Sequence, residues 1–187
     1  MEKEYRSIRE LRSDDGNKVE GYAVVFNSES QWLGGFFEEI APEALDEATI
    51  ASSDIFANIN HDEDKVLARR KYGNGNLELS LDEHGMKFSF PLLDNELSRT
   101  AKSYIDANII DSCSFAFTVA KDEWTTDENG IDHRRILKID KLFDIALCYN
   151  GAYQETEVSC RSYDKYKEEK SKQSDIQNLC DEILAMK

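Results

Sequence analysis

Ser114, His61 and Asp144 are three side chains of the types that nucleophilic catalysis requires. A serine hydroxyl becomes a nucleophile when an imidazole takes its proton, and a carboxylate fixes the tautomer of that imidazole. A set of this kind cleaves acyl bonds, including peptide bonds, and needs neither a metal nor a cofactor. Its members occur in any order along unrelated chains. The elements that hold the three residues must therefore show whether they meet.

His61 follows a predicted strand over residues 54–60, in the sequence NINHDEDK. The end of a strand fixes a side chain on a rigid sheet and leaves it accessible. The other two histidines, His84 and His133, fall in or beside predicted turns. A histidine more often satisfies local hydrogen bonds than performs catalysis, so the assignment of His61 needs support from a second feature.

Ser114 provides that feature, because it lies in the alternating segment SCSFAFTV over residues 112–119. Side chains of a strand alternate between its faces, so Ser114 shares a face with Ala116, and the phenylalanines lie on the opposite, core-facing side. The small Ala116 leaves space for a substrate carbonyl. Cys113 lies on the core side. The four cysteines form no CxxC pair, so we interpret them as reduced thiols and predict no metal site.

Asp144 stands alone among apolar residues in the segment LFDIALC, residues 142–148. A buried carboxylate is costly without a partner. A histidine would serve, and so would an arginine or a backbone amide. A structural hydrogen-bonding role for Asp144 therefore remains open beside the catalytic role.

The elements around these residues are mainly strands, because apolar and polar residues alternate with a period of two. The predicted strands are residues 19–26, 54–60, 112–119 and 134–149, with a hairpin that contains Leu77, Leu79, Leu81, Met86, Phe88 and Phe90. The predicted helices are residues 42–48 and a segment from Leu97 to Ile105 with Asp94 as N-cap and Asn108 as stop. This pattern predicts an α+β fold, mainly an antiparallel β-barrel with a few peripheral helices.

The composition changes after Arg161, where strand signals give way to a charged run. The end of the sequence has apolar residues at helical spacing, among them Ile176, Leu179 and Ile183. We therefore predict a β-rich domain over residues 1–161, followed over residues 162–187 by a charged linker and a C-terminal amphipathic helix or tail.

The charge of the chain disfavours two classes of partner. The sequence has 187 residues with 38 acidic and 23 basic side chains, which gives 23 − 38 = −15. Such a surface repels nucleic-acid phosphates and anionic lipids, so we expect neither a nucleic acid nor a membrane as partner. No apolar run reaches the about 20 residues of a membrane span, and residues 1–15 lack the apolar core of a secretion signal. We expect a cytoplasmic protein.

Six short segments follow one another in a characteristic order. They are GYAVVFN (21–27), FFEEIAPEAL (36–45), NINHD (58–62), the hairpin ending near Gly85, SCSFAF (112–117) and LFDIALCYNGAYQETEVSCR (142–161). Together they resemble the tailed-phage prohead maturation serine proteases, a group related to herpesvirus assemblin. The resemblance covers about residues 5–161 and implies a herpesvirus-protease-like fold for the protease domain, residues 1–161.

The resemblance also implies roles for single residues. The family's catalytic histidine falls on His61, its serine on Ser114, and an acid on Asp144, where the family more often has Glu. The herpesvirus relatives use a second histidine as third member, so His133 remains an alternative to Asp144.

The activity implied is that of a serine endopeptidase that cleaves scaffold and capsid protein during capsid maturation and cleaves itself. Its expected partners are the major capsid protein with its scaffold segment, and further copies of the chain in a homo-oligomer. Its expected location is the assembling prohead in the bacterial host cytoplasm. Departures from the family pattern at Glu43 and Ala116 leave a second hypothesis, a non-catalytic acidic capsid-assembly protein on a protease-derived β-domain.

Overall fold

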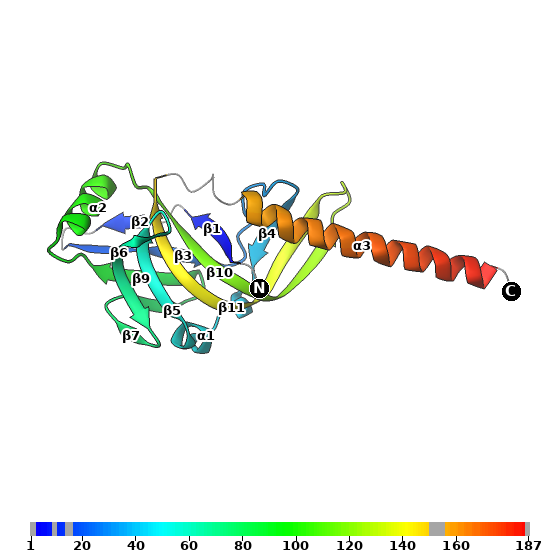
Figure 1. The fold of residues 1–187 in the computed structure, drawn as a ribbon, viewed down its shortest axis with the longest axis horizontal. Helices are drawn as coiled ribbons and strands as arrows, with labels where there is room; N and C mark the ends of the chain where they lie inside the picture. The colour runs from blue at the N-terminus through cyan, green and yellow to red at the C-terminus, as the bar shows by residue number, and fades with distance from the viewer. Residues whose placement is uncertain (1–2, 9–10, 14–16, 150–155, 186–187) are drawn as a thin grey trace.

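A long antiparallel hairpin of β10 (Ser112–Thr126) and β11 (Asp132–Cys148) forms the centre of the molecule (Figure 1). The structure is a computed structural model and describes residues 3–8, 11–13, 17–149 and 156–185. The hairpin turn contains Gly130 in a left-handed conformation, and the Asp127 carboxylate accepts hydrogen bonds from two backbone N–H groups of the turn. A side chain that bonds its own turn in this way is typical of Asp.

The hairpin belongs to the larger of two sheets. In spatial order this sheet contains β1 (Glu4–Ile8), β10, β11, β5 (Asp54–Ile59), β6 (Asp62–Lys71) and β7 (Asn74–Gly75), and β4 (Phe36–Ile40) pairs beside this path with β11. Strand β11 is long enough to have two parallel partners in succession on one edge. Its first half pairs with β4 and its second half with β5.

The second sheet covers the first. It contains β2 (Leu11–Ser13), β3 (Lys18–Val25), β9 (Gly85–Pro91) and β8 (Glu78–Leu81), in that order. The β8–β9 pair confirms the hairpin predicted from alternating residues, with Leu79 opposite Phe88 and Leu81 opposite Met86.

The core lies between the two sheets and is rich in phenylalanine. Phe88 and Phe90 of β9 and Phe115 and Phe117 of β10 are all fully buried. Each such ring stabilises the fold by about 1.5–3 kcal/mol through the apolar surface it removes from water. Because side chains alternate along β10, this burial turns Ser114 towards the opposite face of the sheet, as the sequence predicts.

The fold is α+β, but its described strands do not close into a barrel. Their pairings form two separate sheets, and no pairing among the described strands joins the outer strands β1 and β7 of the larger sheet. The predicted β-barrel is therefore not supported. Alternation of residues predicts which face of a strand is buried, whereas closure depends on which strands pair at the edges.

The first predicted helix, residues 42–48, is replaced by two shorter elements. A 3₁₀ turn covers Pro42–Ala44, and helix α1 covers Glu47–Ser52. The reason is Asp46, whose carboxylate accepts a hydrogen bond from the Thr49 N–H at 2.7 Å and so fixes the start of the helix at the next residue.

Helix α2 (Glu96–Asp106) agrees with the second predicted helix except at its N-cap. The cap is Asn95, which accepts from the backbone of Ser98, whereas Asp94 forms an ion pair with Arg99. Asn108 follows the helix with φ 55°, the left-handed stop that the sequence predicts.

Four charged side chains form a buried ion-pair cluster: Glu4 of β1, Arg6 of β1, Glu38 of β4 and Arg134 of β11. Each is at most 6% exposed. The Arg6 guanidinium donates to both oxygens of Glu38 at 2.5 and 2.6 Å, and Arg134 donates to both oxygens of Glu4 at 2.6 and 3.0 Å. Burial alone would raise the pKa of Glu4, but Arg134 and Arg6 hold it below its ordinary value.

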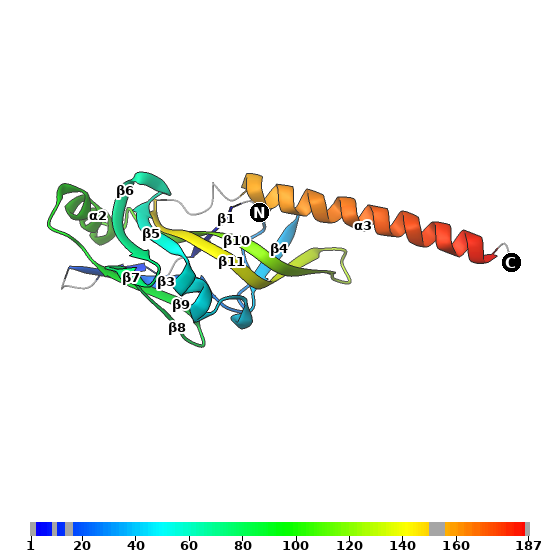
Figure 2. The same cartoon turned by 60° about the horizontal axis from the view of Figure 1, so that its bottom comes forward.

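Helix α3 (Thr156–Ala185) is one continuous element, where the sequence suggested a charged linker before a terminal helix. Its charged residues are good helix formers, and one of their ion pairs, Lys172 with Glu168, has the i,i+4 spacing that stabilises helices. Figures 1 and 2 show the helix extending away from the sheets. The boundary predicted after residue 161 falls inside this helix, so the division into two domains stays a prediction.

The start of α3 packs against the end of the β10–β11 hairpin that lies near its turn, called the distal end below. The Tyr166 ring stacks on Trp124 with centroids 4.3 Å apart, and the Tyr163 hydroxyl donates to Asp132 at 2.9 Å. Farther along the helix, Ile176 is 63% exposed. No helix in the described part of the chain has the length and apolar character needed to cross a membrane.

Candidate active site

The structure brings Ser114, His61 and Asp144 together in one hydrogen-bonded chain. The Ser114 Oγ lies 2.9 Å from His61 Nε2, and His61 Nδ1 lies 2.5 Å from Asp144 Oδ1. Both distances are within hydrogen-bonding range. The three residues selected from the sequence thus lie in the order Ser, His, Asp in which a catalytic triad is connected.

Strand register explains how Ser114 and Asp144 reach the same face. Ser114 of β10 lies opposite Ala146 of β11, and Ala116 lies opposite Asp144. Directly opposed residues of an antiparallel pair point to the same side of the sheet, so all four side chains share one face. Asp144 is therefore a diagonal neighbour of Ser114, and the space between them is bounded by small side chains.

His61 reaches this face from a tight turn between β5 and β6. Ile59 pairs with Asp62, so Asn60 and His61 are the two turn residues, and both have positive φ, 53° and 58°. Two left-handed residues in succession define the type I′ turn, which matches the twist of a hairpin and favours Asn. The turn projects the imidazole of His61 over the neighbouring strands.

The buried side-chain amide of Asn58 holds this turn in place. The Asn58 side chain is 1% exposed, and its Oδ1 accepts a hydrogen bond from the His61 backbone N–H at 3.1 Å. The Asn60 N–H donates to the carbonyl of Leu147, so the turn is also tied to β11. Parallel pairing of β5 with β11 sets Asn58 opposite Ala146, which brings the turn to the level of Ser114.

The arrangement fits one set of hydrogen-bond donors and acceptors. An ionised Asp144 carboxylate can only accept hydrogen bonds, so His61 Nδ1 must donate to it, and the neutral imidazole then has a free lone pair on Nε2. That lone pair can accept a hydrogen bond from the Ser114 hydroxyl. The His61 and Asp144 side chains are each 10% exposed, and shielding from water strengthens such hydrogen bonds.

His133 lies far from this set. It is opposite Thr125 near the hairpin turn, and 125 − 114 = 11 residues of β10 separate that level from Ser114. A strand rises about 3.3 Å per residue. The ring nitrogens of the imidazole instead lie 3.3 Å from a carboxylate oxygen of Glu29 and 3.7 Å from one of Asp127. In this structure, Asp144 is the residue that contacts His61 Nδ1.

Two residues beside His61 were not selected from the sequence. One is Asn58, for which a signal existed, since an amide in the apolar run DIFANI is unusual at a buried position. The other is Tyr5, whose ring contacts the imidazole. It lies in a short strand near the start of the chain with no distinctive pattern around it.

The rest of the described structure offers no second constellation of comparable kind. No group of three or more His, Cys, Asp or Glu side chains among the described residues is arranged to hold a metal ion. Cys113 and Cys148 are buried, and Cys180 is exposed on α3.

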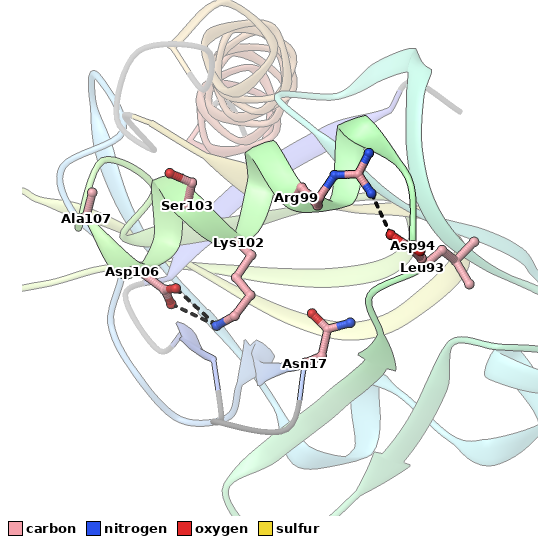
Figure 3. A pocket seen from close by; sticks show the side chains of 8 residues that line it. All are labelled: Asn17, Leu93, Asp94, Arg99, Lys102, Ser103, Asp106 and Ala107. Carbon is pink, nitrogen blue, oxygen red and sulfur yellow. Dashed lines mark hydrogen bonds and ion pairs between the residues drawn. The ribbon is translucent and has the colours of Figure 1, made fainter.

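A hollow of ≈ 660 Å³ lies beside α2 (Figure 3). Its lining includes two cations, Arg99 and Lys102. Each is already paired with a carboxylate of the same lining, Arg99 with Asp94 at 2.5 Å and Lys102 with Asp106 at 3.0 Å. The charges of this hollow are therefore largely satisfied within the chain, and it contains none of the three candidate catalytic residues.

Comparison with known proteins agrees with the geometry. The sequence model of the caudovirus prohead serine protease family matches residues 4–169. The chain belongs to this family. The resemblance predicted from short segments is thus confirmed, and the prohead protease match extends beyond residue 161 into α3.

One solved structure similar to this prohead protease family member is the capsid assembly protease of bacteriophage T4. The similarity covers 79% of this chain and 99% of that chain, with a TM-score of 0.49 and 9% sequence identity. No curated protein matches the sequence.

Proposed function

We propose that the protein is a serine endopeptidase in which Ser114 is the nucleophile, His61 is the general base and then the general acid, and Asp144 orients His61. The observation that supports this most directly is the chain of two hydrogen bonds from Ser114 through His61 to Asp144. Membership of a serine protease family supports the serine endopeptidase activity.

The geometry fits acyl transfer step by step. His61 Nε2 takes the Ser114 proton as Oγ bonds to the scissile carbonyl carbon, and the Asp144 carboxylate stabilises the imidazolium. The imidazolium then gives that proton to the leaving amine as the C–N bond breaks, which leaves an acyl-enzyme. A water molecule, deprotonated by His61, hydrolyses the ester and restores Ser114.

The family assignment supports a proposal for the substrates. A prohead protease acts inside the assembling capsid, so we infer that this chain cleaves the scaffold segment and the N-terminal part of the major capsid protein, and that it cleaves itself. Its location is then the prohead in the host bacterial cytoplasm, and we propose that it works there as a homo-oligomer. The intact Ser–His–Asp set argues against the alternative of a non-catalytic assembly protein.

The test is co-expression with the cognate capsid protein, followed by mass spectrometry of the fragments. Ser114→Ala should abolish cleavage, and His61→Ala should do so nearly as fully, because neither variant can form the attacking alkoxide. Ser112→Ala is the matched control. It removes a neighbouring buried hydroxyl that donates to the Cys148 carbonyl, and it should leave cleavage intact. Processing by Ser114→Ala at the wild-type rate would refute the assignment.

A further inference from the structure

The side chain of Tyr5 lies against the imidazole of His61. The two ring centroids are 4.6 Å apart, and the rings meet edge to face at 74°. This separation and angle are typical of favourable aromatic contacts, which are worth about 0.5–1.5 kcal/mol. Tyr5 comes from β1, an edge strand remote in sequence from His61, so the contact exists only in the folded protein.

Strand alternation gives β1 two different faces. Tyr5 lies opposite Ala116 and therefore points to the face that holds Ser114 and Asp144. Its neighbours Glu4 and Arg6 point to the other face, where they belong to the buried ion-pair cluster. The cluster thus fixes the strand from one side, and the strand holds the Tyr5 ring in place on the other.

His61 needs such support because its hydrogen bonds leave one rotation of the imidazole ring unrestrained. Its backbone is held by Asn58, and the two ring nitrogens bond to Asp144 and Ser114. The two hydrogen bonds of the ring nitrogens lie near the plane of the imidazole, because the nitrogen lone pair and N–H bond lie in that plane. The imidazole can still rotate about the line that joins its two hydrogen-bonded nitrogens, because these bonds offer little resistance to that motion. A rigid side chain packed beside the ring blocks the rotation directly.

Tyr5 is not itself suited to exchange protons. Burial raises the pKa of its phenol, and the negative charges of Asp144 and Glu63 raise it further. The phenol is therefore protonated at neutral pH, and the contact with His61 is one of ring packing.

We propose that Tyr5 is a positioning residue, whose ring holds the His61 imidazole in the orientation that joins Ser114 to Asp144. This role rests on the proposed function for its catalytic consequence, but the orientation itself is a property of the folded chain. β1 is then part of the active site.

The test compares Tyr5→Phe, which keeps the ring, with Tyr5→Leu and Tyr5→Ala, which remove it. One measurement is the rate at which a fluorophosphonate labels Ser114, normalised to the folded fraction. The reaction forms a P–O bond to Oγ and releases fluoride, and His61 takes the hydroxyl proton. We expect Tyr5→Phe to react at nearly the wild-type rate. The Leu and Ala variants should react about 10–100-fold more slowly, because a small displacement of a catalytic group lowers the rate by about this factor.

The second measurement does not depend on activity. The proton between His61 Nδ1 and Asp144 gives a low-field NMR resonance, assigned by its loss in His61→Ala. We expect it to persist in Tyr5→Phe and to broaden or vanish in Tyr5→Ala. Tyr22→Ala is a matched control, because Tyr22 makes a similar contact with His84, with centroids 4.5 Å apart, away from the candidate site.

The outcomes separate the two proposals. If the wild type does not react with the fluorophosphonate but its resonance still depends on the Tyr5 ring, the catalytic function fails and the positioning role stands. If Tyr5→Leu and Tyr5→Ala keep both the resonance and the labelling rate per folded molecule, the positioning role is wrong and the catalytic function is unaffected.

Discussion

The two ends of the β10–β11 hairpin use polar residues in opposite ways. Near the start of β10, Ser114, His61 and Asp144 form a linear chain that ends at a single hydroxyl. Towards the hairpin turn, Arg134 belongs to a cluster in which both guanidinium groups bond to two or more carboxylates, so that charge is matched on all sides. A hydrogen-bonded chain that ends at a hydroxyl has a group with which a substrate can react. In the ion-pair cluster each charged group bonds to another, so its effect is on the stability of the fold.

This difference explains why burial has different consequences at the two ends. A buried ion pair gains Coulomb energy but loses hydration, so replacing both partners can leave the free energy of unfolding unchanged. Removing one partner leaves an uncompensated charge in the protein interior, which is strongly destabilising. In the candidate active site the cost falls on Asp144 alone, and His61 offsets it. We therefore expect variants of the candidate triad to act mainly on reactivity, and variants of Arg134, near the hairpin turn, to act mainly on stability.

Among the variants that compare the two ends of the hairpin, the largest effect is expected for Asp144→Asn. An amide cannot stabilise the imidazolium and can select the wrong tautomer of His61, which in such a set lowers kcat by about 10⁴-fold. His133→Ala, at the distal end, should leave the rate close to that of wild type. The measurement is the rate of capsid-protein cleavage with matched amounts of folded enzyme. Equal losses in the two variants would contradict the separation of the two ends.

The next effect is a loss of stability in Arg134→Met. This change leaves Glu4 and Glu38 with one arginine between them, and breaking a buried pair costs about 3–5 kcal/mol in the free energy of unfolding. Its matched control is Arg135→Met, which removes the neighbouring, more exposed arginine that pairs with Glu39 and should cost about 0–1 kcal/mol. Urea unfolding measures both, and similar values for the two variants would refute the distinction.

A smaller effect is expected where α3 meets the sheet. A Cβ added at Gly35 would overlap the ring of Tyr163, so Gly35→Ala should displace that ring and destabilise the protein by about 1–3 kcal/mol. The fluorescence of Trp124, which stacks on Tyr166, should change with it, while labelling of Ser114 should not. In a Tyr163→Ala background the same change should cost little, and an undiminished cost there would show that the clash is not the cause.

The smallest effect is expected from acid. The folded-state pKa of Glu4 lies below its ordinary value, so its stabilising contribution is complete above the unfolded pKa of about 4.3. It is lost as pH falls through the lower, folded pKa. Unfolding free energies measured at successive pH values should therefore fall more steeply in wild type than in Glu4→Gln. Parallel curves for the two proteins would show that Glu4 does not contribute to the acid sensitivity.

The sequence was informative where a local pattern determines the structure. Alternation in β10 assigns Phe115 and Phe117 to the core and Ser114 to the opposite face, which is what the structure has. A single acid in an apolar strand marks Asp144 as a residue in need of a partner. The β8–β9 hairpin follows from the same period of two.

The remaining features depend on contacts between distant segments. Glu4 and Arg134 are 130 residues apart in the chain and are of residue types that usually lie on the surface. They are buried because β1 and β4 pair beside the hairpin. Tyr5 contacts His61 for the same reason. The barrel prediction was not supported because residue alternation contains no information about the strand pairings at the sheet edges.

The one-sided attachment of α3 affects how the molecule opens. After Lys170, whose ammonium bonds to Thr126 and Asp132, the described side chains of the helix are exposed up to residue 181, and only the helix's own hydrogen bonds and spaced side-chain pairs protect it. At about 1.5 Å per residue, the last 185 − 170 = 15 residues extend about 22 Å. Their amides should exchange with solvent deuterium by local fraying, while those of β10 and β11 require far larger openings. We therefore expect the two ends of α3 to belong to different cooperative units, so that an external protease trims the exposed end without unfolding the sheets.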